Sequence, residues 1–334
     1  MFNNKVILIT GGTGSFGQEF SKEILRKYKP KKLIIYSRDE LKQSLMEKNI
    51  FFANRKKILR FFIGDVRDKD RLHLALKDVD YVVHAAALKQ VNVAEYNPFE
   101  FIKTNIIGAQ NVIDGCISRK VKKVIALSTD KAASAINLYG ATKLASDKLM
   151  VASNSYSGPH TKFSVVRYGN VFGSRGSVAE IFLKLIKDKK KLTLTHPKMT
   201  RFNITLQESV NFVIKCFIKM NGAEIFVPKI PSFRTIDLIR AISNNSNPKI
   251  IGIRPGEKIH EEMISASDAL NSYEFKDYFC ILPQTKIKKT YYSKSKTYPR
   301  PCPENFSYTS YNNKDFLDLH KLKKLFKEYS NQKK

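Results

Sequence analysis

The feature that most constrains this chain is the regular alternation of short apolar runs and amphipathic stretches through its first half. Buried strands are predicted at residues 6–10, 32–37, 58–64, 81–87, 124–128 and 162–168. Helices are predicted between them, at 19–28, 40–54, 69–77, 98–119 and 139–156. Repeated strand–helix–strand units form a parallel sheet with helices on both faces. The sequence therefore predicts an α/β fold built on a doubly wound parallel sheet.

A glycine-rich segment, TGGTGSFG at residues 10–17, follows the first predicted strand and opens the first helix. In this setting the glycine pattern is typical of a Rossmann dinucleotide-binding loop. Gly11 and Gly14 would let the backbone turn and approach a pyrophosphate, and Gly17 would let the helix pack closely on the sheet. The helix N-terminus would offer free N–H groups to the phosphates. The expected contacts from this loop are Gly11, Thr13, Gly14, Ser15, Phe16 and Gly17.

The end of the second strand indicates which dinucleotide binds. An NAD site usually carries an acidic residue there, whereas Ser37 and Arg38 come first in this chain, with Asp39 behind them. A hydroxyl and a guanidinium suit a 2′-phosphate, so NADP is the predicted cofactor. Arg38 could instead form a surface ion pair with Asp39 or Glu40. Asp65 is expected beside the adenine amine, although it could equally cap the following helix. The other expected cofactor contacts are Lys42, Val66, Ala85, Ala86 and Lys89.

Tyr139 and Lys143 form a YxxxK pattern on a predicted helix. Residues four apart lie on one helix face, so both side chains can reach the same point, and both are expected near the cofactor. A phenol is a poor base at neutral pH, but a nearby ammonium lowers its pKa. The pair could then take a proton from a sugar hydroxyl whose carbon gives up a hydride. Thr129, at the end of the preceding strand, could hydrogen-bond the same hydroxyl.

The second half of the chain is organised less regularly. At 334 residues, the chain is long enough for one large core and a smaller lobe. We predict an NADP-binding Rossmann domain over 1–172, with later segments folding back on it. A smaller C-terminal α/β substrate lobe is expected over 173–334. Residues 284–302 are basic and aromatic, and are predicted to form an extended loop or arm.

Composition argues against several other classes of protein. The formal net charge is +29, but the lysines are scattered over the whole chain, so no specific nucleic-acid partner is predicted. A general positive field would still attract an anionic substrate. The four cysteines form no CxxC pair, so we expect neither a metal site nor a disulfide framework. No apolar run approaches the length of a membrane helix, and we expect a cytoplasmic protein.

Taken together, the motifs resemble those of one enzyme family. The segments TGGTGSFG, SRDE, GDVRD, HAAALKQV, STDKA, YGATK, RYGNVFGSRGSV, MTRF and RPGEKIHE are similar to those of the inverting (5-epimerising) UDP-N-acetylglucosamine 4,6-dehydratases. These enzymes are extended short-chain dehydrogenases. The resemblance covers residues 4–284 and resumes around 303–308, whereas 285–302 fits the family poorly.

The resemblance implies roles for particular residues. Thr129, Tyr139 and Lys143 match the family's triad, and Asp130 and Lys131 match the dyad that performs elimination. The implied reaction oxidises C4, eliminates water across C5 and C6, returns the hydride to C6 and reprotonates C5 on the opposite face. We expect Lys131 to remove the C5 proton and Asp130 to protonate the C6 hydroxyl, although the two could share this work. A lysine base needs a pKa well below its usual value.

The family segments also imply contacts with the UDP-sugar. The family segments that contact the cofactor or the substrate include Lys89, Asn105, Asn170, Val178, Thr195, Arg201, Arg254 and Glu257, and each of these could instead be a surface charge or a loop hydrogen bond. His84 is interpreted as a structural histidine. The resemblance further implies a homo-oligomer, often a hexamer. The main alternative is a UDP-N-acetylhexosamine C4-epimerase, which needs no group at C5 or C6. A non-catalytic NADP-binding protein is a more distant alternative.

Overall fold

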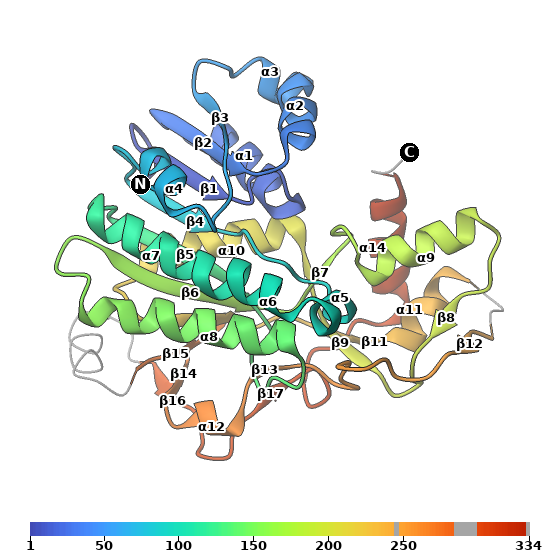
Figure 1. Cartoon of the computed structure of the whole chain (residues 1–334). Coiled ribbons are helices and arrows are strands. Elements are labelled where there is room, and N and C mark those ends of the chain that lie inside the picture. Colours follow the sequence, from blue (N-terminus) through green and yellow to red (C-terminus); the bar gives the residue numbers. More distant parts are fainter. Residues whose placement is uncertain (244–246, 284–298, 332–334) are drawn as a thin grey trace.

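The computed structural model describes residues 1–243, 247–283 and 299–331, and Figure 1 shows the whole chain. Its strands are β1 (Val6–Thr10), β2 (Lys32–Ser37), β3 (Leu59–Ile63), β4 (Tyr81–His84), β5 (Lys123–Thr129), β6 (Lys162–Tyr168), β7 (Asn170–Phe172), β8 (Thr193–Leu194), β9 (Thr200–Thr205), β10 (Ile225–Pro228), β11 (Ser232–Arg234), β12 (Lys249–Ile250), β13 (Glu262–Ile264), β14 (Ser272–Glu274), β15 (Tyr278–Ile281), β16 (Arg300–Pro301) and β17 (Tyr308–Thr309). Its helices are α1 (Ser15–Lys27), α2 (Glu40–Lys48), α3 (Ile50–Ala53), α4 (Lys69–Ala75), α5 (Val91–Tyr96), α6 (Pro98–Phe101), the π-helix η1 (Ile102–Ile107), α7 (Gly108–Ser118), α8 (Leu138–Ala152), the 3₁₀ helix η2 (Ser153–Ser155), α9 (Val178–Lys187), α10 (Leu206–Lys219), α11 (Thr235–Ile242), α12 (Ala266–Ala269) and α14 (Leu319–Asn331).

Ten of these strands form the central sheet, in the order β16-β14-β15-β10-β6-β5-β4-β1-β2-β3. The strands from β10 to β3 run parallel, and β15, β14 and β16 add an antiparallel edge. Helices α4, α7 and α8 cover one face, while α1 and α10 pack together on the other (Figure 1). The β3-β2-β1-β4-β5-β6 order is that of a doubly wound Rossmann sheet, so the predicted fold class is confirmed.

A second, smaller apolar core lies beyond the carboxyl ends of the parallel strands. It is built from α9, α11, α14 and the strands beside them, with Phe182, Phe233, Leu238 and Leu322 at its centre. The chain after residue 172 contributes to both cores, because β10, α10, β14 and β15 return to the central sheet. The boundary at residue 172 stays a prediction. The cleft between the two cores is where a ligand of a doubly wound fold binds.

Three elements differ from the sequence prediction in ways that affect the site. Helix α1 begins at Ser15 rather than residue 19, so the glycine loop leads directly into its first turn. Strand β4 ends at His84 rather than residue 87, because the N–H groups of Ala85 and Ala86 each donate to Thr10 Oγ1, at 3.2 Å. The predicted helix 98–119 is interrupted by the π-helix η1, whose Asn105 side chain holds both backbone groups of Leu88, at 2.9 Å.

The basic segment 284–302 lies mostly outside the described residues, and only 299–302 can be placed. Arg300 and Pro301 form the edge strand β16. Among the helices that the structure describes, none is both long and apolar enough to cross a membrane.

Candidate active site

The glycine loop between β1 and α1 fits a dinucleotide cofactor. Gly11 has a φ of +66°, and a Cβ atom there would lie 2.9 Å from the Ala86 backbone. A Cβ atom on Gly17 would lie 2.5 Å from the Gly12 carbonyl oxygen. Each position therefore excludes any larger side chain, and the backbone of the loop stays open at the N-terminus of α1. Such an N-terminus attracts phosphate through its free N–H groups.

The end of β2 presents a hydroxyl and cations to the cleft. Ser37 Oγ lies 2.8 Å from Thr13 Oγ1, so the two hydroxyls join the glycine loop to the second strand. Asp39 caps α2 and forms an ion pair with Lys42, which occupies its carboxylate. Arg38 keeps about half of its side chain exposed, at 54%. This end of the sheet therefore leaves the Arg38 guanidinium available to an anionic group.

The structure corrects two sequence alternatives about this region. Arg38 pairs neither with Asp39 nor with Glu40 among the described contacts, but lies 3.5 Å from Asp65. Asp65 does not cap a helix, because Asp68 is the N-cap of α4. The Asp65 carboxylate instead accepts hydrogen bonds from the Arg67 side chain, at 2.7 and 3.0 Å. Burial acts against the charged form, but these Arg67 contacts prevail and lower the pKa of Asp65.

One large cleft, of about 1120 Å³, brings the predicted residues together. Its lining includes the predicted cofactor residues Gly11, Thr13, Gly14, Ser15, Phe16, Gly17, Ser37, Arg38, Asp39, Lys42, Asp65, Val66, Ala85, Ala86 and Lys89. It includes the predicted catalytic residues Thr129, Asp130, Lys131, Tyr139 and Lys143. It also includes the predicted substrate residues Asn170, Val178, Thr195, Arg201, Arg254 and Glu257. Shared lining shows that these side chains can meet one ligand, while their individual roles stay predictions.

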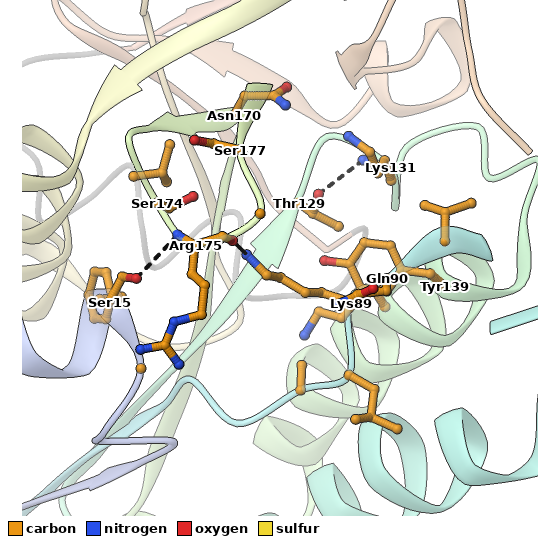
Figure 2. A pocket seen from close by; sticks show the side chains of 18 of the residues that line it. Ser15, Lys89, Gln90, Thr129, Lys131, Tyr139, Asn170, Ser174, Arg175 and Ser177 are labelled. Atoms are coloured by element: carbon orange, nitrogen blue, oxygen red, sulfur yellow. Dashed lines mark hydrogen bonds between the residues drawn. The ribbon is translucent and has the colours of Figure 1, made fainter. Parts of the chain in front are cut away.

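Asp130 and Lys131, the predicted elimination dyad, lie in a compact cluster of charges at the end of β5. Lys131 Nζ lies 3.0 Å from Asp130 Oδ1 and 3.0 Å from Glu261 Oε1. Thr129 Oγ1 donates to the same Asp130 oxygen, at 2.9 Å. Asp130 and Glu261 are almost fully buried, whereas the Lys131 side chain keeps 23% of its surface exposed. Figure 2 shows Thr129, Lys131 and Tyr139 grouped on one wall of the cleft.

The charges in this cluster contradict one expectation about Lys131. Burial acts to lower the pKa of Lys131, but the carboxylates of Asp130 and Glu261 outweigh it and raise the pKa above its ordinary value. A depressed pKa was expected for a lysine base. Burial raises the pKa of Asp130, and the nearby Glu261 adds to this effect. Lys131 is therefore an ammonium at neutral pH.

Tyr139 also differs from the simple expectation of an activated phenol. Burial raises the pKa of Tyr139 to about 12, although the Lys131 ammonium and a hydrogen bond with Thr129 act in the opposite direction. Burial lowers the pKa of Lys143, and the Asp147 carboxylate partly opposes this. Burial therefore outweighs the lowering of the Tyr139 pKa that is expected from a neighbouring ammonium.

A buried network supports Lys143 from behind. Asp147, one turn further along α8, accepts hydrogen bonds from Ser128 Oγ at 2.8 Å and from Arg167 at 3.2 Å. Arg167 is 1% exposed and also donates to the Met263 carbonyl oxygen, at 3.0 Å, and to Asp268, at 3.3 Å. These contacts tie α8, β5, β6 and the β13 segment together beneath the catalytic wall.

The segment after β7 connects the two sides of the cleft. The Arg175 backbone N–H donates to Ser15 Oγ at 3.4 Å, and its carbonyl oxygen accepts from Lys89 Nζ at 2.9 Å (Figure 2). Burial is the main cause that lowers the pKa of Lys89. On the substrate side, Arg201 contacts Glu257 at 3.4 Å. The segment around Arg175 therefore bridges the first turn of α1 and the segment that follows β4.

Sequence reasoning also missed cleft residues. Glu261 and Arg175 both line the cleft, and both fall inside the segments RPGEKIHE and RYGNVFGSRGSV that had been singled out. Their presence in those motifs was the available signal. His84 and Asn105 are buried and do not line the cleft. Burial lowers the pKa of His84 to about 3, with Lys143 contributing, so this histidine is neutral. Its Nδ1 atom lies 2.9 Å from Thr10 Oγ1, which fits a structural role.

This fold and this cleft define a nucleotide-sugar enzyme of the extended short-chain dehydrogenase class, and comparison with known proteins specifies the family. The family described as "Polysaccharide biosynthesis protein" matches residues 7–283. A UDP-N-acetylglucosamine 4,6-dehydratase (inverting) of Campylobacter jejuni is 60% identical over 289 residues, covering 86% of this chain and 85% of that protein. The chain belongs to the family of inverting UDP-N-acetylglucosamine 4,6-dehydratases.

Two further relatives bear on function and fold. A protein of Rickettsia canadensis named UDP-glucose 4-epimerase is 43% identical, covering 84% of each chain. The solved structure of Pen from Bacillus thuringiensis has a TM-score of 0.88 at 36% identity, covering 98% of this chain and 99% of that one. The likeness to Pen extends over nearly the whole chain, including the second lobe.

Proposed function

We propose that this chain is an NADP-dependent UDP-N-acetylglucosamine 4,6-dehydratase that inverts the configuration at C5. The observation that carries this proposal is the position of Lys131 Nζ, 3.0 Å from a buried Asp130 carboxylate on the same wall as Thr129 and Tyr139. An oxidation at C4 needs only the triad. The adjoining amine and carboxylate add an acid and a base for the neighbouring carbons.

The cofactor would lie along the carboxyl ends of β1 and β2. The glycine loop and the first turn of α1 would hold its pyrophosphate, and Ser37, Arg38 and Lys42 would favour the 2′-phosphate of NADP over the free hydroxyl of NAD. When bound, NADP would supply the hydride acceptor for oxidation at C4 and the hydride donor for reduction at C6. Tyr139, as the phenolate, would accept the proton of the C4 hydroxyl.

One proton shift within the dyad prepares the elimination. Moving a proton from Lys131 Nζ to Asp130 Oδ1, across 3.0 Å, converts an ammonium and a carboxylate into an amine and a carboxylic acid. The amine removes the C5 proton, which the C4 ketone has made acidic. The C6–O bond breaks, and the departing oxygen takes the Asp130 proton to leave as water. Lys131 ends as an ammonium and Asp130 as a carboxylate, so the dyad returns to its starting charges. As hydride adds to C6, C5 would take a proton from solvent on the opposite face, and Tyr139 would release its proton to solvent.

The substrate's diphosphate would meet the cationic side of the cleft. Lys89 and Arg254 both line it, and an arginine suits bidentate contact with phosphate. Asn170, Val178, Thr195, Arg201 and Glu257 line the same side and would contact the rest of the UDP-sugar. We also infer that the enzyme self-associates, which light scattering on the purified protein would measure.

Product analysis tests this proposal directly. The purified protein is incubated with UDP-N-acetylglucosamine and NADP in deuterated water, and the product is followed by NMR. Deuterium at C5 together with a 4-keto-6-deoxy sugar is expected. Lys131→Ala should still bind NADP but form no such product. Normal turnover by this variant would remove Lys131 from the mechanism.

The alternative of a C4-epimerase is favoured by the name of the Rickettsia relative. An epimerase would use the glycine loop, Tyr139 and Lys143 in the same way, and would invert C4 without exchange at C5. It would have no use for an acid and a base beside C5 and C6. C4 inversion alone in the same NMR experiment would favour the epimerase over the dehydratase.

A further inference from the structure

Glu261 is a buried acid that the proposed mechanism has not yet used. It lies immediately before β13, with 2% of its surface exposed, and it lines the cleft. Its backbone is fixed on both sides, because its N–H donates to Ser310 Oγ at 2.9 Å and its carbonyl oxygen accepts from Ser310 N at 2.8 Å. The side chain therefore extends from an anchored backbone toward Lys131.

The two carboxylate oxygens of Glu261 have different surroundings. Oε1 lies 3.0 Å from Lys131 Nζ and 3.8 Å from Arg201 Nε. Oε2 is buried and has no hydrogen-bond partner among the described residues, and the same is true of Asp130 Oδ2. Moving a carboxylate from water into the protein interior costs free energy unless the carboxylate is paired with a cation or a hydrogen-bond donor. Glu261 is thus held at the site by two cations and by its own anchored backbone.

Two carboxylates therefore contact one ammonium at the same distance, but their environments differ. Burial opposes the charge on Glu261, yet the cations of Lys131, Arg201 and Lys258 prevail and lower its pKa. Burial raises the pKa of Asp130, which has no arginine beside it among the described contacts. When the environments of two acids push their pKa values apart, their roles separate as well. Glu261 stays ionised, while Asp130 is the acid that can carry a proton.

We propose that Glu261 is a positioning residue for the elimination, which holds the Lys131 nitrogen beside Asp130 and stabilises the ammonium that forms when Lys131 takes the C5 proton. The inference rests on the proposed dehydratase function. Glu261 itself donates no proton and touches no reacting atom in this scheme. Without it, Asp130 would be the remaining carboxylate in contact with Lys131 among the described residues.

The charge of Glu261 should be visible in the pH dependence of the elimination. The active dyad holds one proton between Asp130 and Lys131, so activity falls at low pH when a second proton binds and at high pH when the shared proton is lost. Glu261 raises the pKa of both groups. Replacing it by glutamine should therefore move both limbs of the pH profile toward lower pH, by about one pH unit for a charge at this distance.

The experiment compares Glu261→Gln with the wild type and with Glu262→Gln. Glu262 is the neighbouring acid; its carboxylate contacts Ser134 rather than Lys131, and it does not line the cleft. The pH profile of kcat is measured with substrate protonated or deuterated at C5, so that cleavage of the C5–H bond is followed. Glu261→Gln should shift both limbs downward, whereas Glu262→Gln should keep the wild-type profile. NADP affinity should stay unchanged in both variants.

Each outcome decides between the proposals. A lower kcat with unshifted limbs in Glu261→Gln would reduce Glu261 to a packing role and overturn the inference. Absence of dehydration by the wild type would instead overturn the proposed function. If Glu261→Gln fails to fold, Glu261→Asp retains the charge but withdraws it from Lys131. A reduced kcat with a smaller downward shift is expected for Glu261→Asp, and a wild-type kcat and profile would refute the role.

Discussion

Replacing Lys131 by methionine should make the stability of this protein strongly dependent on pH. The substitution keeps an unbranched side chain that extends as far as the ε carbon but removes the ammonium between Asp130 and Glu261, which are 1% and 2% exposed. The carboxylates of Asp130 and Glu261 then lie buried without the ammonium between them, and Arg201 Nε lies 3.8 Å from Glu261 Oε1. The variant therefore tests whether the dyad is held together by charge.

The magnitude follows from the burial of the two acids. Removing one partner of a buried ion pair costs about 3–5 kcal/mol, because the remaining charge is left uncompensated. The cost falls when a carboxyl can take up a proton. An unfolded aspartate has a pKa of about 3.9, and in the folded variant the pKa of Asp130 should lie well above this. Below about pH 4 the variant should therefore be destabilised little. As the pH rises from there toward the pKa of Asp130 in the folded variant, the free energy of unfolding should fall by up to about 1.4 kcal/mol per pH unit.

Urea denaturation of the variant and the wild type between pH 5 and pH 8.5, followed by far-UV circular dichroism, measures this loss. Lys103→Met is the matched control, because Lys103 contacts Glu100 at the same 3.0 Å but on the protein surface. The control should stay close to the wild type at every pH. A Lys131→Met variant as stable as the wild type, or a loss that does not change with pH, would refute the argument that buried charge organises the dyad.

Two other substitutions probe the cofactor end of the cleft and the buried network behind Lys143. Arg38→Ser should weaken NADP binding about 10- to 100-fold and leave NAD binding nearly unchanged, because a charge-assisted contact to the 2′-phosphate contributes about 1.5–3 kcal/mol. Equilibrium titration with both cofactors measures the two affinities. An equal loss of affinity for NADP and NAD would exclude a contact between Arg38 and the 2′-phosphate. Arg167→Met leaves Asp147 buried without its 3.2 Å partner and should cost about 3–5 kcal/mol. Adding Asp147→Asn should recover part of that loss in urea denaturation, whereas additive losses would show that the pair is not coupled.

The carboxylates around Lys131 explain why the sequence alone did not predict the direction of its pKa shift. A lysine base was expected to have a depressed pKa, yet two carboxylates raise it. Asp130 is adjacent in sequence and was recognised, but Glu261 is 130 residues further along the chain. Only the tertiary structure brings Glu261 to 3.0 Å from Lys131 Nζ, the same distance as Asp130.

The sequence by itself determined what depends on short spacings. These local patterns are the strand–glycine loop–helix unit, the Tyr139–Lys143 spacing and the adjacent Asp130 and Lys131. Residues this close in sequence are held together by the geometry of a single helix, strand end or turn. The tertiary structure decided what depends on burial and on distant segments. It brought Glu261 to Lys131, laid the backbone of Arg175 between Ser15 and Lys89, and raised the pKa of Tyr139 to about 12. The physical reason is that desolvation and ion pairing are set by everything that surrounds a side chain, and most of those neighbours lie far away in sequence.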